Sequence, residues 1–499
     1  DVVWYGSVGE DIHLNDERTL ARSALTADII DRLDETHVVL VQSPPMTGKT
    51  SLATLLCQAL VNKHKEEKKK AVVCSFSVAG MFENETFEGF FKNRCKLDWV
   101  HAKGALPTRD RAVYLILDEA QLVYNDLAST FIAFWELVKL VQIDAAYQVR
   151  IVMFADYGFN VEHTRHGTSI GCDDRMVFGI NELNFRPAEV FEYITKWFKG
   201  AKGLSSSAMK TFCTTVQELT GGHVGLCTSV IDALNKVYEK NWSDPPSAKT
   251  WIRMLQGGWL YEPDNGALFE ALAQTRAVKV LETLRVEDLD RLERAVCGVN
   301  PWSNGDIVEQ CLHNGILVRS EWQLNFSSPV MWRYFVKLRV GRMPRALDVP
   351  KSLPEMIARV MEAMNYTNVR QELCRTFLPN DIGIPAWQLE FYKAVYRCTP
   401  SSFVTSADVG ALFGASGFID FTIASGGLLW GIELLREASN LAESIERFSP
   451  GGRYSSLGLT EFCLVDFRCV ASIDGDEMKR IAADMRLSKN LSVVCMTHE

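Results

Sequence analysis

The sequence predicts an α/β protein of several domains, and three observations support this prediction. The chain has 499 residues, which is too many for a single hydrophobic core, because cores stop growing near about 250 to 300 residues. Continuous apolar strands alternate with helical stretches over residues 36–182, a pattern typical of a parallel sheet covered by helices. Strands and helices mix again over residues 350–499. We therefore expect two α/β regions separated by helical segments.

The composition narrows the class of protein. The hydrophobic fraction is 47% and the charged fraction 23%, values that fit a globular chain and exclude a disordered one. The net charge of −9 excludes binding of polyanions over the whole surface, so contact with nucleic acid requires a local basic patch. No apolar stretch is long enough to cross a bilayer, and we expect no membrane partner. The 13 cysteines include no C-x-x-C pair, which predicts reduced thiols that pack as small hydrophobic groups.

Composition shifts and proline-rich stretches divide the chain into five parts. A leader segment, residues 1–35, ends in a helical run over 19–33. A core with strands near 38–41, 71–75, 112–117 and 149–155 follows, and then comes a stretch with helical periodicity alone. The predicted parts are the leader at 1–35, the α/β core at 36–182, a helical lid at 183–262, a helical unit with a hairpin at 263–349 and a second α/β domain at 350–499.

A phosphate-binding loop follows the first strand of the core. Residues 43–51 read Ser-Pro-Pro-Met-Thr-Gly-Lys-Thr-Ser and lead into a helix, the arrangement in which backbone N–H groups and a helix N-terminus face phosphates. Lys49 should reach the β- and γ-phosphates of ATP, and the Thr50 hydroxyl should ligate Mg²⁺. Ser43 stands where such loops usually begin with glycine, which removes a permissive backbone position. The candidate nucleotide-binding residues here are Ser43, Gly48, Lys49, Thr50 and Ser51.

Two acids at the end of a buried strand complete the predicted nucleotide site. The strand 113–117 ends in Asp118 and Glu119, and the ends of parallel strands meet at one edge of a sheet. Asp118 can hold Mg²⁺, and Glu119 can orient and polarise the attacking water, so the sequence predicts hydrolysis as well as binding. The next strand ends in Asp156, which either senses the γ-phosphate or forms the turn before Gly158.

The middle of the chain has the pattern of a winged helix-turn-helix. Helical stretches precede a hairpin at 315–319 and 323–326, and a basic helix follows. Arg333, Lys337 and Arg339 of this helix are the candidate contacts to DNA phosphates. The same helix can equally pack on the rest of the protein or face solvent.

The last domain places ionisable side chains inside apolar strands. Asp420 and Glu433 lie on two strands that form a hairpin, and Glu390 lies on a preceding amphipathic helix. Buried carboxylates require a metal, a cation or hydrogen-bond partners, so we expect these acids to converge on a Mg²⁺ ion that supplies an attacking water. The alternative is a structural salt bridge of Asp420 and Glu433 with Arg436.

Arg436 is the candidate for neutralising phosphate charge in this domain. It follows Glu433 by three residues, whereas a spacing of two would place both side chains on one strand face. We therefore expect either a strand bulge here or the start of a helix.

In the order of these motifs along its sequence, the chain resembles the Crinkler effector family of oomycetes and fungi. The matching architecture joins an AAA+/STAND-like P-loop ATPase, a winged helix and a PD-(D/E)XK restriction-endonuclease-like domain. The resemblance covers nearly the whole chain and rests on residues 48–50, 117–121, 325–329, 387–392, 419–421 and 431–436.

This resemblance implies a secreted microbial effector that enters the host nucleus and promotes cell death. It implies ATP and Mg²⁺ as cofactors, a DNA endonuclease controlled by the ATPase, and duplex DNA, host nuclear proteins or further copies of the chain as partners. Two other functions stay open at this stage. One is a nucleotide-switched interaction protein with an inactive nuclease-like domain, and the other is an origin-recognition-like DNA-binding ATPase.

Overall fold

The computed structural model describes most of the chain. It covers residues 2–8, 12–82, 85–124, 130–144, 146–156, 174–256, 267–273, 275–296, 305–320, 323–341, 343–366, 386–400, 403–407, 420–425, 428–436, 441–449, 459–469 and 491–498. Over these ranges, no helix has the length and apolar character that a membrane crossing requires. Eight cysteines are described with their side chains, and they are free thiols, buried apart from the half-buried Cys398: Cys57, Cys74, Cys95, Cys213, Cys227, Cys311, Cys398 and Cys463.

The described chain divides into two compact units. Unit 1 consists of Asp1–Phe198 together with the short segments Gly222–Thr228 and Glu309–Gly315, and unit 2 contains the remainder. Each unit has its own large sheet.

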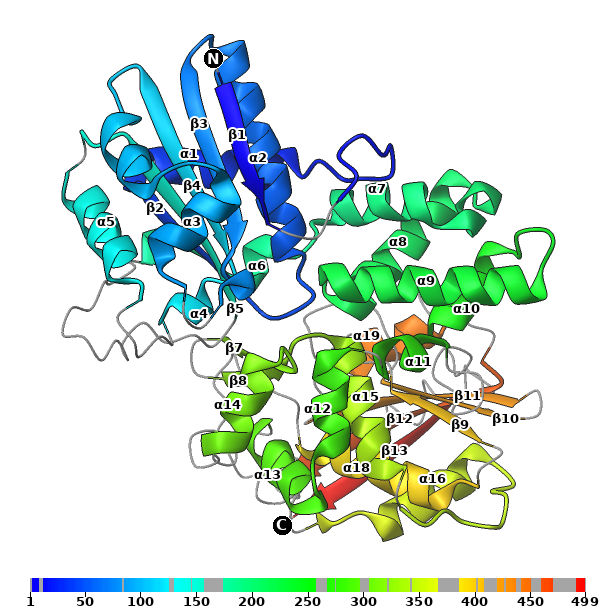
Figure 1. Ribbon diagram of the computed structural model, residues 1–499. Helices are drawn as coiled ribbons and strands as arrows, with labels where there is room; N and C mark the ends of the chain where they lie inside the picture. The colour runs from blue at the N-terminus through cyan, green and yellow to red at the C-terminus, as the bar shows by residue number, and fades with distance from the viewer. Residues whose placement is uncertain are drawn as a thin grey trace. The chain divides into compact units, whose positions relative to one another are not determined.

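Unit 1 is built on a sheet of six parallel strands (Figure 1). Its strands are β1 (Val2–Ser7), β2 (Val38–Ser43), β3 (Lys70–Ser77), β4 (Arg111–Asp118), β5 (Val149–Asp156) and β6 (Val177–Phe178). The order is β1-β3-β4-β5-β2-β6. The parallel sheet and its four strands expected from the sequence are confirmed. Because β4, β5 and β2 are neighbours, Asp118, Asp156 and Ser43 reach the same edge of the sheet.

Helices cover both faces of this sheet. On one face, α1 (Ser23–Thr36), α2 (Lys49–Glu66) and the short α6 (Ile180–Leu183) bury apolar side chains against the strands. On the other face, α3 (Phe87–Cys95) and α5 (Ile132–Ile143) bury an aromatic cluster around Phe76. Unit 1 also contains the helices α4 (Gln121–Tyr124) and α7 (Pro187–Trp197).

The leader segment differs from the prediction. Its first residues form β1, which pairs with β3 from Val2 opposite Ala71 to Ser7 opposite Phe76. The expected helix is present but begins later, at Ser23. A six-residue strand whose partner lies about seventy residues away gives no local periodic signal, so residues 1–35 are not a purely helical leader.

Helices and a hairpin fill the middle of the chain. The hairpin of β7 and β8 is antiparallel and lies where the sequence predicted it. The elements are α8 (Ser206–Thr220), α9 (Val224–Asn241), α10 (Ala248–Gln256), α11 (Ala267–Ala273), α12 (Arg276–Thr283), α13 (Val286–Val296), α14 (Gly305–His313), β7 (Leu317–Ser320), β8 (Gln323–Phe326) and α15 (Pro329–Val340).

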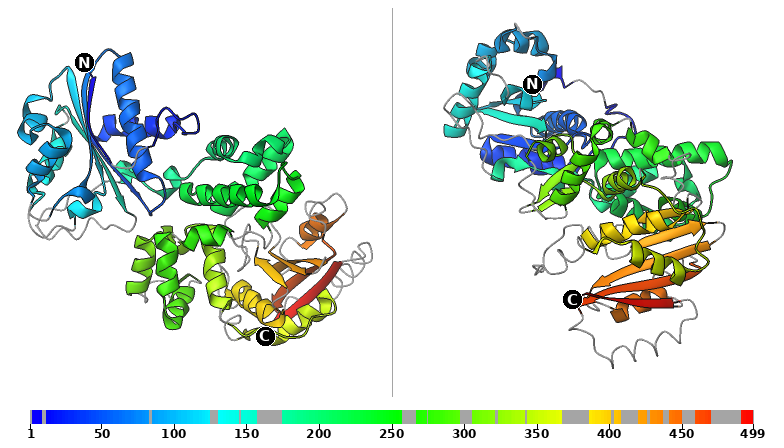
Figure 2. Two further views of the ribbon diagram at one scale, coloured as in Figure 1. Left: turned by 45° about the vertical axis from the view of Figure 1, so that its right-hand side comes forward. Right: turned by 90° about the horizontal axis from the view of Figure 1, so that it is seen from below.

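The C-terminal part of unit 2 is a second α/β layer structure, whose strands are drawn in orange and red in Figure 2. Its elements are α16 (Leu353–Ala363), α18 (Ala386–Cys398), β9 (Val404–Ala407), β10 (Phe421–Ser425), β11 (Leu428–Arg436), α19 (Leu441–Phe448), β12 (Glu461–Cys469) and β13 (Leu491–His498). The order is β13-β12-β11-β10-β9, and β10 is antiparallel to both β9 and β11, whereas β11, β12 and β13 are parallel to one another. Helices α16 and α18 pack on one face of the sheet, and α19 packs on the other.

Candidate functional site

The loop after β2 is closed by its own side chains. Ser43, in the position usually held by glycine, is fully buried, and its Oγ lies 2.6 Å from Thr47 Oγ1. The Thr47 hydroxyl is also 2.9 Å from the Pro44 carbonyl. Met46 and Gly48 have positive φ values of 68° and 78°, so the left-handed turns of the loop fall on these two residues. The serine therefore keeps the loop compact without the expected glycine.

Lys49 lies inside this loop at the start of α2. Its ammonium donates to the carbonyls of Ser43 at 2.8 Å and Pro44 at 2.9 Å, and it lies 3.3 Å from an Asp156 oxygen. Burial lowers the pKa of Lys49, and the carboxylate of Asp156 opposes that shift. Asp156 thus faces the phosphate loop, as the first of its two predicted roles requires.

Thr50 and Asp118 come together across the sheet edge. The Thr50 hydroxyl donates to Asp118 Oδ2 at 2.7 Å. The other oxygen, Oδ1, is buried and has no hydrogen-bond partner among the described residues. Burial raises the pKa of Asp118, because the charged form is poorly solvated. A half-buried hydroxyl and a buried carboxylate with one unsatisfied oxygen fit the oxygen ligands that Mg²⁺ takes, so this pair can hold the ion.

Glu119 is fixed beside this pair by a residue whose role the sequence did not reveal. Gln121 donates its side-chain amide to Glu119 Oε2 and accepts from the backbone N–H of Asp156 at 3.2 Å. Glu119 has a φ of 57°, an uncommon conformation that turns the chain at the end of β4. Gln121 therefore links the ends of β4 and β5 and orients the predicted catalytic carboxylate. Ser51 lies in the first turn of α2 and is half-buried.

Two distant segments of unit 1 close over the loop. The backbone N–H of Gly225, in the first turn of α9, donates to the Met46 carbonyl at 2.8 Å. A Cβ atom on Gly225 would lie 2.6 Å from that carbonyl oxygen, so no larger residue fits there unless the loop moves. Gly315, which follows α14, would similarly place a Cβ atom 2.6 Å from Pro44 Cβ. Residues from three separate parts of the sequence therefore pack together at this loop.

Comparisons with known proteins return low similarity. No family model matches the chain, and no curated protein matches it. The Walker-type ATPase paby2304 of Pyrococcus abyssi has 12% identity and a TM-score of 0.38, with 66% of this chain and 98% of that chain covered. The ORC2 protein of Aeropyrum pernix, solved in ADPNP and ADP complexes, has 11% identity and a TM-score of 0.38, covering 65% and 92%. Drosophila ORC bound to DNA has 13% identity and a TM-score of 0.26, covering 68% and 90%. The nucleotide site therefore rests on its own geometry.

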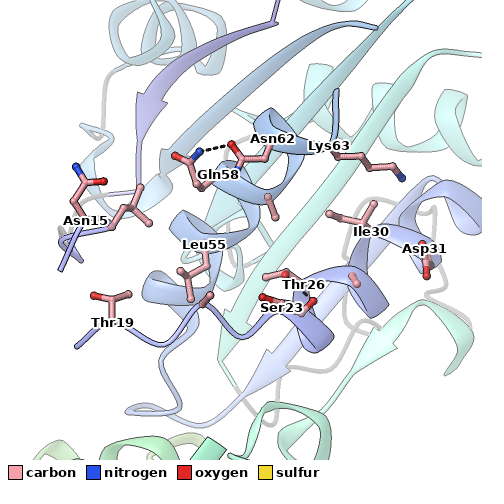
Figure 3. A pocket seen from close by; sticks show the side chains of 14 residues that line it. Asn15, Thr19, Ser23, Thr26, Ile30, Asp31, Leu55, Gln58, Asn62 and Lys63 are labelled. Carbon is pink, nitrogen blue, oxygen red and sulfur yellow. Dashed lines mark hydrogen bonds between the residues drawn. The ribbon is translucent and has the colours of Figure 1, made fainter. Parts of the chain in front are cut away.

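A separate pocket of about 600 Å³ lies between residues 14–23, α1 and α2 (Figure 3). Leu55, Ala59 and Ile30 give it apolar walls, and Gln58 and Asn62 line it from α2 with a hydrogen bond of 2.8 Å between them. None of the residues 43–51 lines this pocket, so it is distinct from the phosphate loop.

In unit 2, Asp420 directly precedes β10 and Glu433 lies on β11, and the pairing of Phe421 with Ile432 brings the two acids to the same end of this hairpin. Asp420 accepts from the Leu434 N–H at 2.6 Å and from Gln388 at 3.3 Å. The Oε1 atom of Glu433 accepts from Ser444 Oγ at 2.8 Å and from Arg447 at 2.7 Å. Glu433 Oε2 is buried and has no partner in the described part of the chain. Both acids are therefore held mainly by protein donors.

Glu390 belongs to a different group of charges. It accepts from Lys393 on the same helix at 2.9 Å, and Lys393 also pairs with Glu293 of α13. Over the described ranges, no three carboxylate, imidazole or thiol groups form a metal-binding cluster. The predicted convergence of Glu390, Asp420 and Glu433 on one ion is therefore not found there, because each acid has its own hydrogen-bonding partners.

Arg436 closes β11 in an unbroken register, opposite Phe467 of β12. Both expectations for this position, a bulge or a helix start, are therefore wrong. The side chain of Arg436 lies outside the described residues. A different ion pair is buried in this sheet, since Arg468 Nε lies 2.5 Å from Asp466 Oδ2 and both residues are at most 1% exposed.

The basic helix α15 makes contacts inside unit 2. Arg339 pairs with Glu293 at 2.9 Å and also with Asp290, and its side chain is 11% exposed. The Lys337 ammonium lies 4.3 Å from the centre of the Phe269 ring, and burial lowers the pKa of this lysine. Arg333 is half-buried. Lys337 and Arg339 thus pack against other parts of unit 2, which was the alternative to DNA contact. DNA binding by Arg333, Lys337 and Arg339 stays a prediction.

Glu433 should make the stability of unit 2 depend on pH. Burial raises its pKa in the folded protein above the ordinary value, so folding is favoured while the group is protonated. This contribution is complete below the ordinary glutamate pKa and is lost as pH rises through the raised value. We expect Glu433→Gln, which cannot ionise, to gain stability relative to wild type between pH 4 and pH 8.

The measurement is hydrogen exchange of the full chain in increasing denaturant at pH 4 and at pH 8. The exchange of the β11 peptides gives the denaturation midpoint at each pH. Glu443→Gln is the control, because Glu443 also pairs with Arg447 but is 61% exposed. Parallel pH profiles for wild type and Glu433→Gln would contradict the assignment.

Proposed function

We propose that unit 1 binds ATP with Mg²⁺ and hydrolyses it. This proposal rests on the convergence of Lys49, Thr50 and Asp118 at one edge of the parallel sheet, with Glu119 fixed beside them. This arrangement provides a cation for phosphate, a hydroxyl and carboxylate for Mg²⁺, and a carboxylate for water. The similar structures include Walker-type ATPases, and the activity is proposed from the residues of this chain.

Each residue has a definite task in this proposal. Lys49 exchanges its bonds to the Ser43 and Pro44 carbonyls for bonds to the β- and γ-phosphates. Thr50 and Asp118 hold Mg²⁺, which would neutralise phosphate charge when bound. Glu119 orients the attacking water and accepts its proton, and Gln121 keeps that carboxylate in place.

Replacement of the proposed base tests hydrolysis separately from binding. Glu119→Gln preserves shape and hydrogen bonding but cannot accept a proton, so we expect phosphate release to fall about 10²- to 10⁴-fold. The affinity for Mg²⁺·ATP should stay within a few-fold, because Glu119 is not assigned to phosphate binding. Glu136→Gln on α5 is the matched control. Unchanged turnover in Glu119→Gln would show that another group activates the water.

The C-terminal domain is proposed to act as the part that ATP controls. Its resemblance to Crinkler nuclease-like domains supports DNA cleavage, and so does the placement of two buried acids, Asp420 and Glu433, at the same end of the hairpin. The protein donors that hold these acids instead favour an interaction domain without cleavage. We favour the interaction function, in an effector that the resemblance would place in a host nucleus.

Nicking of supercoiled plasmid with Mg²⁺ distinguishes the two functions. The interaction proposal predicts no nicking above the level of a protein-free reaction. Nicking by wild type that Asp420→Ala and Glu433→Ala both abolish would establish the nuclease and overturn the interaction proposal.

A further inference from the structure

A buried histidine lies where α9 meets the phosphate loop. His223 follows Gly221 and Gly222, whose positive φ values of 63° and 75° form the turn between α8 and α9. The turn is fixed because the Phe185 N–H donates to the Gly222 carbonyl at 2.7 Å. The His223 carbonyl then accepts from the Cys227 N–H at 2.9 Å, in the first turn of α9. The position of the histidine is therefore set by backbone hydrogen bonds on both sides.

The residues that follow His223 touch the phosphate loop directly. Val224 Cγ1 would lie 3.4 Å from a Cβ atom on Gly48, which is ordinary contact distance. The Gly225 N–H donates to the Met46 carbonyl at 2.8 Å. A movement of Met46 or Gly48 when phosphate enters the loop would therefore displace the first turn of α9.

The side chain of His223 has an unsatisfied polar atom. The residue is 2% exposed, and its Nδ1 has no hydrogen-bond partner among the residues that the structure describes. A buried polar atom without a partner costs about 1 to 3 kcal/mol, so a ligand that pairs with it recovers that free energy.

The charges around His223 suit an anion. Burial lowers its pKa to about 4, and the ammonium of Lys49 adds to this shift. Lys49 in turn is influenced by the carboxylates of Asp156, Asp118 and Glu119. A phosphate that binds Lys49 would introduce negative charge beside an imidazole that is neutral at pH 7.

We propose that His223 donates a hydrogen bond from its imidazole to a phosphate of the nucleotide and so ties the start of α9 to occupancy of the loop. The inference rests on the proposed function of unit 1. It adds a positioning residue from a segment that no phosphate-loop motif contains. Because the phosphate favours the protonated imidazole, nucleotide binding should strengthen as pH falls from 8 to 6.

The test is a calorimetric titration of the full chain with Mg²⁺·ATP and Mg²⁺·ADP at pH 6, 7 and 8. The variants are His223→Leu, which keeps the bulk but removes the donor, and His223→Asn, whose amide can donate from nearly the same place as Nδ1. We expect His223→Leu to bind about 10- to 100-fold more weakly, the range for a hydrogen bond to a charged group. His223→Asn should stay within about threefold of wild type at pH 8, and both variants should lose the pH dependence.

Three outcomes would overturn the inference, and they are distinguishable. Equal affinity and equal pH dependence of wild type and His223→Leu, with binding lost in Lys49→Met, would remove His223 from the site and leave the ATPase proposal standing. If His223→Leu does not fold, a pH-independent affinity of wild type together with full binding by His223→Asn would likewise remove His223 from the site. Absence of binding by wild type would reject the ATPase proposal itself.

Discussion

Lys49→Met should abolish tight nucleotide binding, and we expect the dissociation constant for Mg²⁺·ATP to rise at least about 100-fold. Hydrogen bonds to charged groups contribute about 1.5 to 3 kcal/mol each, and Lys49 is placed to make more than one of them. Its ammonium already lies among the Ser43 and Pro44 carbonyls, so little rearrangement is required. Methionine keeps the buried alkyl chain and removes the charge.

Calorimetry with Mg²⁺·ATP measures this effect. The control is Lys63→Met on the same helix, because Lys63 forms an exposed pair with Asp34 and should leave the affinity unchanged. A dissociation constant for Lys49→Met within threefold of wild type would mean that ATP binds elsewhere.

Arg468→Met should destabilise unit 2 by about 3 to 5 kcal/mol, because it removes the cation that pairs with the fully buried carboxylate of Asp466. The partner variant Asp466→Asn combined with Arg468→Met should recover part of the loss, since neither charge then remains. The free energy is best taken from denaturant-dependent hydrogen exchange of β12, because a chain of several domains does not unfold in one step.

An exposed pair gives the comparison. Arg359 binds Asp348 and Glu355 and keeps 29% of its side chain exposed, so Arg359→Met should cost at most about 1 kcal/mol. Equal effects of Arg468→Met and Arg359→Met would show that the Asp466 carboxylate is solvated or otherwise neutralised in solution.

The arrangement of the candidate nucleotide site was predictable because its signals are local. Apolar strands that end in Ser43, Asp118 and Asp156 must meet at one edge once the sheet is parallel. The left-handed conformation of Met46 was not predictable, since methionine has no preference for it. Gln121 lies in the matched stretch 117–121, but its role and that of His223 emerge only from contacts between segments far apart in the chain. An unusual glycine pair before His223 was the one available signal.

The C-terminal domain shows the limit of sequence patterns. Its hairpin and its buried acids were predicted correctly, but the residues that would hold the acids were not. Glu433 is paired with Arg447 of the following helix, and Glu390 with Lys393. A carboxylate in an apolar strand indicates that a partner exists without saying whether it is a metal or an arginine. The same holds for Arg339, whose partners lie on α13.

Phosphate release by the wild-type chain tests the central claim most directly. The chain is incubated with ATP and Mg²⁺ and, in parallel, with ATP and excess EDTA. The geometry of Lys49, Thr50, Asp118 and Glu119 predicts catalytic release of phosphate that requires Mg²⁺. Release no faster than in a protein-free reaction would contradict the assignment of unit 1 as an ATPase.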